Sequence, residues 1–308
     1  MTYPLTIEPI ELAHGIRLEC RVRGAADAPV VVMLHGFPQG AFVWDALSCT
    51  LAEQGWRCVA PNLRGFGGSS QPTEPSAYRA KFLTQDIVEL LRAVSAQPVA
   101  GLIAHDWGGA LAWGVAAQHP ELMERFIAIN SPHSATFLRA LQSDPEQQAA
   151  SAYMHYLSRE DAAERLSANG FEKLWGFLMR HSDGASHAPN WLTAELKQAH
   201  EAIWAQGLKG PCAYYQQSPL KPPLTPQDAV MALELPPEMT HVRVPTDVIW
   251  GLQDAALRPS LLEGLSDSVD DLRIHPFADA SHWVLHEAPD RVADCVLGAL
   301  RRKPSPHY

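Results

Sequence analysis

The sequence predicts an α/β fold in which helices flank a mostly parallel sheet and a helical insertion interrupts the strands. Two observations predict it. Apolar runs of strand length alternate with helical segments over residues 29–130, which is the pattern of successive βαβ units. Strand-like runs are then missing from about 134 to 240 and return at 244. Helices inserted there would cover the carboxyl edge of the sheet, where such folds bind their ligands.

The first half of the chain supplies most of the predicted strands. Residues 5–23 alternate enough to form two strands with a turn at His14 and Gly15. The run "PVVVML" (29–34) is continuous and β-branched, as in a strand buried on both faces of a parallel sheet. The elements expected next are a helix near 41–54, a strand at 57–63, a helix at 77–96, a strand at 99–105, a helix at 107–119 and a strand at 125–130.

The insertion and the end of the sheet follow. The segments at 163–179 and 191–206 have helical spacing, and a proline-rich crossing comes after them at 218–230. Strands are expected again at 244–251 and 272–278, before a closing helix at 288–302. The predicted domains are a core made of residues 1–133 and 241–308 and a helical cap made of residues 134–240.

Composition excludes several classes of protein. The chain has 24 Lys and Arg against 34 Asp and Glu, a net charge of −10, so it lacks the basic surface that binds nucleic acid. Its five cysteines include no C-x-x-C pair and are expected to be buried thiols in a reducing compartment. We find no signal peptide at the N-terminus and no apolar run long enough to span a membrane. We therefore expect a cytoplasmic protein, either a monomer or a homodimer.

The stretch "GLIAHDWGGALAW" (101–113) carries the strongest functional signal. A buried strand, a sharp turn and an alanine-rich helix follow one another, as in the nucleophile elbow that presents one side chain above a sheet. The central residue is Asp106, where a serine hydrolase has serine. A carboxylate can attack carbon directly and form a covalent ester, without a base to remove a proton. A base is then needed only to activate the water that hydrolyses the ester.

Two later segments supply the remaining catalytic groups. Asp254 follows the strand in "VIWGLQD", and His282 lies on a loop before the last helix. The order nucleophile, acid, histidine is that of α/β-hydrolase triads, so we expect His282 to be the base and Asp254 to orient it. The main-chain N–H groups of Phe37, in "LHGFPQ", and of Trp107 are expected to form the oxyanion hole.

No motif predicts a cofactor or a metal. His282 and His286 have the spacing of metal ligands on a helix, but no acidic or cysteine cluster accompanies them. The glycine-rich "RGFGGSS" (64–70) lacks the G-K-[ST] ending of a phosphate loop, so we interpret it as a turn after a strand. His105, next to the nucleophile, is expected either to have a structural role or to be exposed to solvent.

Five motifs in order resemble the epoxide hydrolase branch of the α/β-hydrolase superfamily, over about residues 7–301. They are "HGFP" (35–38), "PNLRGFGGSSQP" (61–72), "HDWGG" (105–109), "WGLQD" (250–254) and "SHW" (281–283). The chain departs from the family at Ala104, where the elbow usually has glycine, but a small residue still lets the turn pack. The resemblance implies an α/β-hydrolase fold with a helical cap, and a hydrolase of ether bonds that opens an epoxide with water to give a vicinal diol.

In this family two tyrosines of the cap stabilise the departing epoxide oxygen, because a phenol with a pKa near 10 stays a proton donor at neutral pH. The context "SAYMHYL" implies Tyr153 as the first phenol. The second matches Tyr215 in "AYYQ", and Tyr214 is left as the alternative because the outer residues of this segment replace the family's Asn and Arg. Tyr156 is expected to pack, as is Tyr214 if Tyr215 is the phenol.

Other activities use a similar site. A haloalkane dehalogenase typically has Asn or Trp after "HG", where this chain has Phe37, and a fluoroacetate dehalogenase resembles "HDRG", where it has Trp107. A carboxylesterase-type hydrolase would use the same triad, and a catalytically silent relative would keep the fold for ligand binding. The Trp, Phe, Leu and Met content of the cap favours an apolar pocket. We therefore expect a small apolar epoxide and water as reactants.

Overall fold

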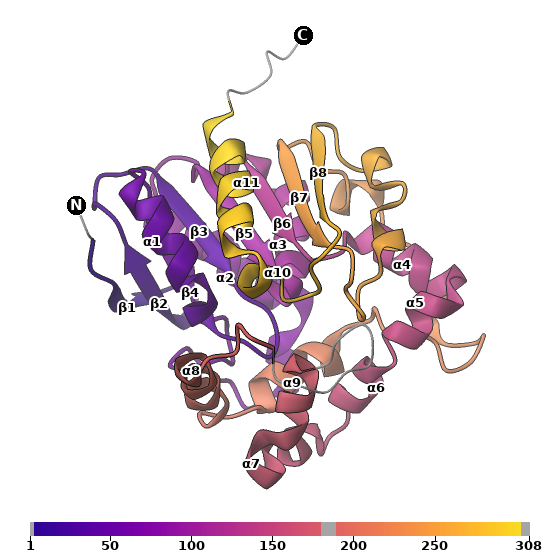
Figure 1. Ribbon diagram of the computed structural model, residues 1–308. Helices are drawn as coiled ribbons and strands as arrows, with labels where there is room; N and C mark the ends of the chain where they lie inside the picture. The colour runs from indigo at the N-terminus through magenta and orange to yellow at the C-terminus, as the bar shows by residue number, and fades with distance from the viewer. Residues whose placement is uncertain (1–2, 180–188, 303–308) are drawn as a thin grey trace.

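An eight-stranded sheet forms the centre of the part of the chain that the structure describes, residues 3–179 and 189–302 (Figure 1). The structure is a computed structural model. The strands lie in the order β1-β2-β4-β3-β5-β6-β7-β8, and all neighbours from β4 onward are parallel, whereas β2 pairs antiparallel with both β1 and β4. The strands are β1 (Thr6–Glu11), β2 (Arg17–Arg23), β3 (Val30–Leu34), β4 (Arg57–Pro61), β5 (Gly101–His105), β6 (Phe126–Ile129), β7 (Thr246–Gly251) and β8 (Leu272–Phe277). The predicted mostly parallel sheet is confirmed.

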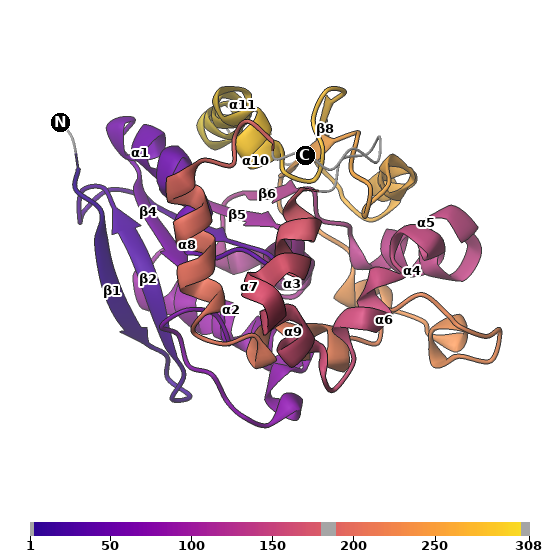
Figure 2. The ribbon, with the colours of Figure 1, turned by 60° about the horizontal axis from the view of Figure 1, so that its bottom comes forward.

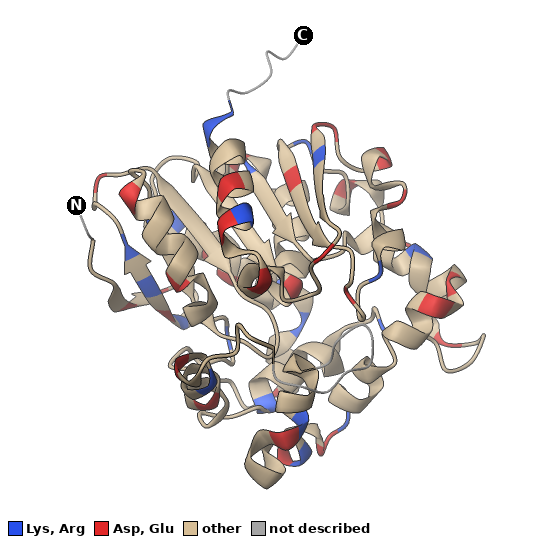
Figure 3. Ribbon diagram, in the orientation of Figure 1, with Lys and Arg blue, Asp and Glu red and all other residues tan. Residues whose placement is uncertain are grey.

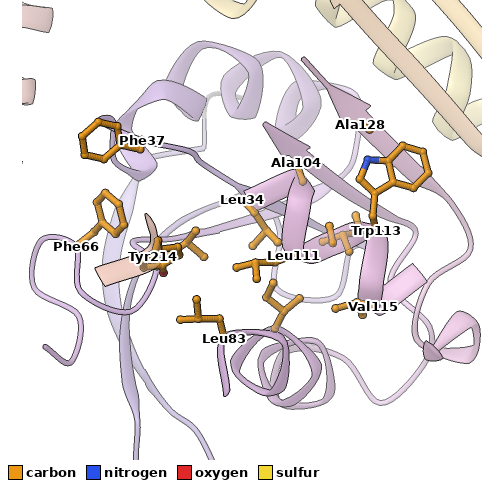
Figure 4. Packing of buried hydrophobic residues seen from close by; sticks show 14 of the residues in the cluster. Leu34, Phe37, Phe66, Leu83, Ala104, Leu111, Trp113, Val115, Ala128 and Tyr214 are labelled. Carbon is orange, nitrogen blue, oxygen red and sulfur yellow. The ribbon is translucent and has the colours of Figure 1, made fainter. Parts of the chain in front are cut away.

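Side chains of the central strands alternate between two layers of helices. In β3, Val31 and Met33 pack with α1 and α11, whereas Val32 and Leu34 pack with α2 and α3. Figure 4 shows Leu34 beside Leu111 in the second layer. Burial on both faces explains why this strand is apolar at every position. The helices are α1 (Asp45–Glu53), α2 (Ala80–Val94), α3 (Asp106–Gln118) and α11 (Pro289–Arg301).

The order of strands reverses between β3 and β5. From β3 the chain crosses to β4 on one side, and from β5 it crosses to β6 on the other, although β3 and β5 are neighbours. The loops that leave their carboxyl ends therefore diverge and open a crevice, which is where α/β folds bind ligands. The segments that leave β3 and β5 begin with His35 and Asp106.

No strand occurs among the described residues between β6 and β7, as the sequence predicts. Helices α6 to α9 gather at one end of the sheet, at the bottom of Figure 1 and in front in Figure 2. Leu157, Leu166 and Trp204 belong to the same buried cluster as residues of β3 and α3, so these helices share one continuous hydrophobic core with the rest of the fold. The helices between the two strands are α4 (Ser134–Ser143), α5 (Pro145–Ala150), α6 (Tyr153–Leu157), α7 (Ala162–Leu178), α8 (Ala194–Trp204) and α9 (Lys209–Gln217).

One helix and one strand have boundaries that differ from the predicted ones, and the backbone conformation shows why. The helix expected at 41–54 starts as a 3₁₀ turn, η1 (Ala41–Trp44), before α1 begins. The strand expected at 125–130 ends one residue early, because Asn130 has a φ of 37° and leaves the extended conformation. The remaining short helices are η2 (Pro75–Tyr78), η3 (Pro120–Leu122), η4 (Ala229–Ala232), η5 (Pro237–Met239), η6 (Pro259–Leu262), η7 (Leu265–Asp267) and α10 (Val284–Glu287).

Charged side chains avoid the centre of the sheet. Strands β3, β5 and β6 contain no Lys, Arg, Asp or Glu, whereas these residues are frequent on the helices and on outer strands (Figure 3). This distribution follows from the cost of burying an unpaired charge. Within residues 3–179 and 189–302, none of the helices has the length and apolar character needed to cross a membrane.

Candidate active site

Asp106 lies at a sharp turn between β5 and α3, where the elbow motif predicts it. Its φ of 49° is uncommon for a residue other than glycine, and such backbone strain concentrates at functional sites. Two glycines make room for the turn. A Cβ on Gly36 would lie 2.3 Å from the Cβ of Asp106, and a Cβ on Gly108 would lie 2.6 Å from the carbonyl oxygen of Leu34. The turn therefore brings the carboxylate to the crevice at the carboxyl edge of the sheet.

The main chain stabilises the charged form of the Asp106 carboxylate. The N–H of Phe37 donates to Asp106 Oδ1 at 2.8 Å. Burial raises the pKa of Asp106 above its usual value, while His282 and the N–H groups of Phe37 and Trp107 oppose this shift because they favour the charged form. The N–H of Phe37, one of the two predicted for the oxyanion hole, thus bonds to the nucleophile, and the second oxygen, Oδ2, faces His282.

His282 lies between two carboxylates. Its Nδ1 donates to Asp254 Oδ2 at 2.7 Å, and its Nε2 lies 3.7 Å from Asp106 Oδ2. Burial lowers the pKa of His282, but Asp254 and then Asp106 favour the imidazolium and together raise the pKa to about 9. The fold therefore brings together the three residues predicted as a triad, each from a segment that follows a different strand.

Asp254 is held by donors that the sequence analysis did not identify. Asn130 Nδ2 donates to Asp254 Oδ2 at 2.8 Å, and the N–H groups of Ala256 and Leu257 donate to Oδ1 at 2.8 and 2.9 Å. The amide oxygen of Asn130 accepts a main-chain N–H at the end of β7, at 2.8 Å. These bonds orient the carboxylate toward His282. An asparagine at the last position of the strand predicted at 125–130 was the available signal, because Asn tolerates a positive φ.

His105 supports the loop that carries His282. Its Nε2 donates to the main-chain oxygen of His282 at 3.0 Å, and the two ring centroids are 4.7 Å apart. Burial lowers the pKa of His105 well below its usual value, so the ring is neutral. This buried placement fits a structural role for His105 and not exposure to solvent.

Tyr153 and Tyr215 line the same cavity as Asp106 and His282. Their ring centroids are 6.1 Å apart, with an angle of 74° between the ring planes. Burial raises the pKa of both phenols, so both hydroxyls keep their protons at neutral pH. The rest of the wall is largely apolar and includes Phe37, Pro38, Ala150, Phe177, Ala256 and Trp283.

The neighbouring tyrosines have other contacts. The hydroxyl of Tyr214 donates to the main-chain oxygen of Arg64 at 2.9 Å, and its ring packs edge-on against Phe66 (Figure 4). The ring centroid of Tyr156 lies 5.4 Å from Lys173 Nζ. Neither tyrosine belongs to the wall of the cavity that contains Asp106. The geometry therefore favours Tyr215 over Tyr214 as the second phenol.

A buried glutamine joins the loop of Phe37 to the helical insertion. Gln39 Nε2 donates to His286 Nε2 at 2.8 Å and to His200 Nε2, on α8, at 3.2 Å. His200 Nδ1 donates to the carbonyl of Leu196 at 2.7 Å, which leaves its Nε2 as an acceptor. Burial lowers the pKa of His200 to about 4 and that of His286 to about 3, so both rings accept hydrogen bonds at neutral pH.

The two histidines with metal-ligand spacing have different partners. His282 bonds to Asp254, whereas His286 bonds to Gln39. Among the residues that the structure describes, no cluster of three or more His, Cys, Asp or Glu side chains is arranged to hold a metal ion.

Known proteins are similar to this chain along nearly its whole length. A family model for the alpha/beta hydrolase fold matches residues 29–289. The AB hydrolase superfamily protein YfhM of Bacillus subtilis is 30% identical over 94% of this chain and 96% of its own length. Epoxide hydrolase 3 of Xenopus tropicalis is 30% identical over 93% of this chain and 75% of its own. A Bacillus megaterium epoxide hydrolase, crystallised with an inhibitor, has a TM-score of 0.86 at 27% identity and covers 96% of this chain and 100% of that one.

Proposed function

The chain belongs to the α/β-hydrolase family, in its epoxide hydrolase branch, and we propose that it hydrolyses an apolar epoxide to a vicinal diol. The reaction passes through a covalent ester of Asp106, beneath a cap formed by residues 134–240 on a core of residues 1–133 and 241–308. The observation that carries the proposal is that Asp106, Tyr153 and Tyr215 line one cavity. A carbon nucleophile and two proton donors are what the opening of an epoxide ring requires.

The first step opens the ring. Asp106 Oδ2 attacks an epoxide carbon, the new ester C–O bond forms as the ring C–O bond breaks, and the ring oxygen takes a proton from Tyr153 or Tyr215. The transfer is favourable because an alkoxide, like hydroxide, is a much stronger base than a phenolate. Asp106 Oδ1 stays with the N–H of Phe37 and becomes the carbonyl oxygen of the ester.

The second step hydrolyses the ester. His282 Nε2 removes a proton from water, and the hydroxide attacks Cγ of Asp106. The N–H groups of Phe37 and Trp107 stabilise the resulting oxyanion. The ester bond then breaks, and the departing oxygen of the diol takes the proton from His282. The carboxylic acid left on Asp106 passes its proton to His282, which becomes the imidazolium of the resting site again, so the enzyme returns to its starting state.

Formation of the ester also changes the basicity of His282. In the resting site the negative charge of Asp106 contributes to the raised pKa of His282, after the larger effect of Asp254. Esterification neutralises Asp106, so the pKa of His282 falls. Its imidazolium then gives its proton to the phenolate left by ring opening, which restores the phenol. His282 thereby becomes the neutral base that the second step needs, while Asp254 still orients it.

Two further observations support a cell compartment and a substrate class. All five cysteines are free thiols, which supports a cytoplasmic location because disulfides are rare there.

The aromatic and aliphatic wall of the cavity favours aryl or alkyl epoxides over sugars and charged acids.

A panel of epoxides with detection of the diol tests the proposed function. We expect the purified protein to convert styrene oxide and simple alkyl epoxides to their diols without any added cofactor. Release of halide from a haloalkane, or of acid from an activated ester, with no diol from any epoxide would instead indicate a dehalogenase or an esterase. Binding of epoxides without turnover of any of these substrates would favour a ligand-binding protein.

A further inference from the structure

A buried glutamine of the helical insertion joins two catalytic segments. Gln147, on α5, has no exposed surface. Its Nε2 donates to Ser151 Oγ and to the main-chain oxygen of Ala256, both at 2.8 Å, and its Oε1 accepts the N–H of Arg258 at 3.0 Å. We propose that Gln147 is a positioning residue that couples the phenol of Tyr153 to the acid of the triad. This inference rests on the proposed function and goes beyond it.

The three bonds use both faces of the Gln147 amide. The two hydrogens of Nε2 each have an oxygen acceptor, and Oε1 has a main-chain donor. The opposite orientation of the amide would place Oε1 beside the carbonyl of Ala256 and Nε2 beside the N–H of Arg258, so it would lose both main-chain bonds. The contacts therefore give this buried side chain a single orientation.

Ser151 connects the amide to Tyr153. The N–H of Ser151 donates to the main-chain oxygen of Gln147 at 2.9 Å, and its own main-chain oxygen accepts the N–H of Met154 at 3.0 Å. Tyr153 is the first residue of α6, and Met154 is the second. The bond from the Gln147 amide to Ser151 Oγ therefore fixes the start of the helix that carries the phenol.

Ala256 connects the amide to Asp254. The main-chain oxygen of Ala256 accepts from Gln147, while its N–H donates to Asp254 Oδ1 at 2.8 Å. Gln147 also holds the next part of this loop at Arg258. A shift of the loop would therefore move the Asp254 carboxylate, which orients His282 through its other oxygen.

Both segments belong to the wall of the active-site cavity. The wall includes Tyr153, from the start of α6, and Asp254 and Ala256, from the loop after β7. Gln147 is buried and does not line this cavity. It therefore acts on the reaction through its neighbours and not through contact with the substrate.

A more exposed set of contacts joins the same loop to the start of α5. The guanidinium of Arg258 lies beside Asp144 and Glu146, and Ser260 Oγ donates to Asp144 Oδ2 at 3.1 Å. These contacts do not involve the Gln147 amide, so they keep the loop on α5 when the amide is removed. Replacement of Gln147 should therefore loosen the geometry of the site and leave the protein folded.

Gln147→Met tests the effect on the phenol, since methionine keeps the length of the side chain but removes its hydrogen bonds. The variant is combined with His282→Gln, in which hydrolysis is blocked, so the growth of the protein–substrate adduct measures ring opening alone. We expect adduct formation from styrene oxide to be about tenfold slower than in His282→Gln, since a misplacement of about 1 Å can cost two orders of magnitude in rate. Rapid quenching and mass spectrometry of the intact protein measure this rate.

The titration of His282 tests the effect on the acid. Burial lowers the pKa of His282, and Asp254 makes the largest opposing contribution, which raises it to about 9. A displaced Asp254 contributes less, so in the single variant Gln147→Met the pKa of His282 should be lower by at least about half a pH unit, as measured by histidine NMR. Ser151→Ala removes only the bond toward Tyr153. It should slow adduct formation and leave the titration of His282 unchanged.

Gln142→Met is the matched control, because Gln142 Nε2 donates to two main-chain oxygens outside the site, both at 2.9 Å. It should lose stability in urea and keep the parent values of both readouts. Equal values in Gln147→Met and Gln142→Met would overturn the inference and leave the proposed function standing. A change in only one readout of Gln147→Met would also overturn it, because the amide would then hold one segment and not both. Absence of adduct in His282→Gln itself would count against the proposed covalent route.

Discussion

His282 Nε2 lies 3.7 Å from Asp106 Oδ2, whereas His282 Nδ1 lies 2.7 Å from Asp254 Oδ2. The first distance is longer than a hydrogen bond and the second is a strong one. His282 is therefore anchored to Asp254 and is not bound to the nucleophile. In a serine hydrolase the histidine must bind the nucleophile to remove its proton. A carboxylate has no proton to lose, so this separation suits a base that acts on water.

Asp106→Ala should abolish turnover of epoxides, because no other side chain in the turn can form the ester. A single turnover in labelled water tests the same step in the wild-type enzyme. The first diol molecules should carry an oxygen from Asp106 and no label, since water attacks the carbonyl carbon of the ester and not the substrate. Mass spectrometry of the diol measures this, and label in the first turnover would rule out the covalent route.

His282→Gln should separate the two chemical steps. Attack by Asp106 needs no base, whereas hydrolysis of the ester does, so the variant should accumulate the ester and gain the mass of the substrate. Mass spectrometry of the intact protein detects the adduct. Asp254→Asn should accumulate less adduct, because it disturbs the orientation of His282 but keeps the imidazole. An inactive His282→Gln variant that never gains mass would show that His282 has a different role.

The charge of Asp106 should contribute to the raised pKa of His282, after the larger effect of Asp254. Asp106→Asn removes that charge but keeps the shape, as the ester does, so His282 should titrate below the pKa of about 9 in the wild type. Histidine NMR measures the shift. In the wild type the raised pKa stabilises the fold fully below the unfolded value of about 6.5, and this contribution is lost as the pH rises toward 9. Urea unfolding at pH 6 and 9.5 should show that loss, with a smaller loss in Asp106→Asn.

The local features of the fold were predictable from the sequence because they depend on neighbouring residues. The β-branched run of β3 and the turn at Asp106 are both encoded within a few positions of the chain. The placement of Asp254 and His282 was also predictable, since the carboxyl ends of parallel strands meet at one edge of the sheet.

Contacts between distant segments were not predictable in this way. Gln39 is 161 positions from His200 and 247 positions from His286, and nothing in its local sequence indicates that it meets either. The bond from Asn130 to Asp254 likewise spans 124 positions. The hollow next to Asp106 that Ala110, Phe137 and Met154 line depends on how α4 and α6 sit over α3, which is set by packing between distant parts of the chain.

Gln39 should influence both stability and the oxyanion hole. Gln39→Leu keeps the volume but leaves two buried imidazole nitrogens without a donor, which should lower the free energy of unfolding by about 1–3 kcal/mol. Because Phe37 is two residues away, kcat for epoxides should also fall. Gln142→Leu is a matched control, since Gln142 Nε2 bonds to two carbonyl groups outside the site. It should lose stability with kcat unchanged, and equal effects of both variants on kcat would argue against a positioning role for Gln39.

The phenols of Tyr153 and Tyr215 should both contribute to ring opening. If Tyr153 and Tyr215 both bond to the departing oxygen, each single Phe variant keeps one donor and remains measurably active. Loss of one such donor costs roughly 3 kcal/mol, or about two orders of magnitude in rate, by analogy with the removal of an oxyanion-hole donor. The double variant should lose ring opening almost wholly while it stays folded, because Tyr→Phe keeps the ring that packs. Initial rates of diol formation and circular dichroism measure the two properties.

An activated ester distinguishes this role from a general loss of function. Its leaving group needs no phenol, and its oxyanion is held by Phe37 and Trp107, so the Tyr153 and Tyr215 changes should affect its cleavage much less. Tyr156→Phe is the first control and should change little. Tyr214→Phe removes the bond to the Arg64 carbonyl and should lower stability more than epoxide turnover. If these controls lost activity while the 153/215 double variant still opened epoxides, the assignment of the phenols would be wrong, because the proton donor would then be Tyr156 on α6 or Tyr214 on α9.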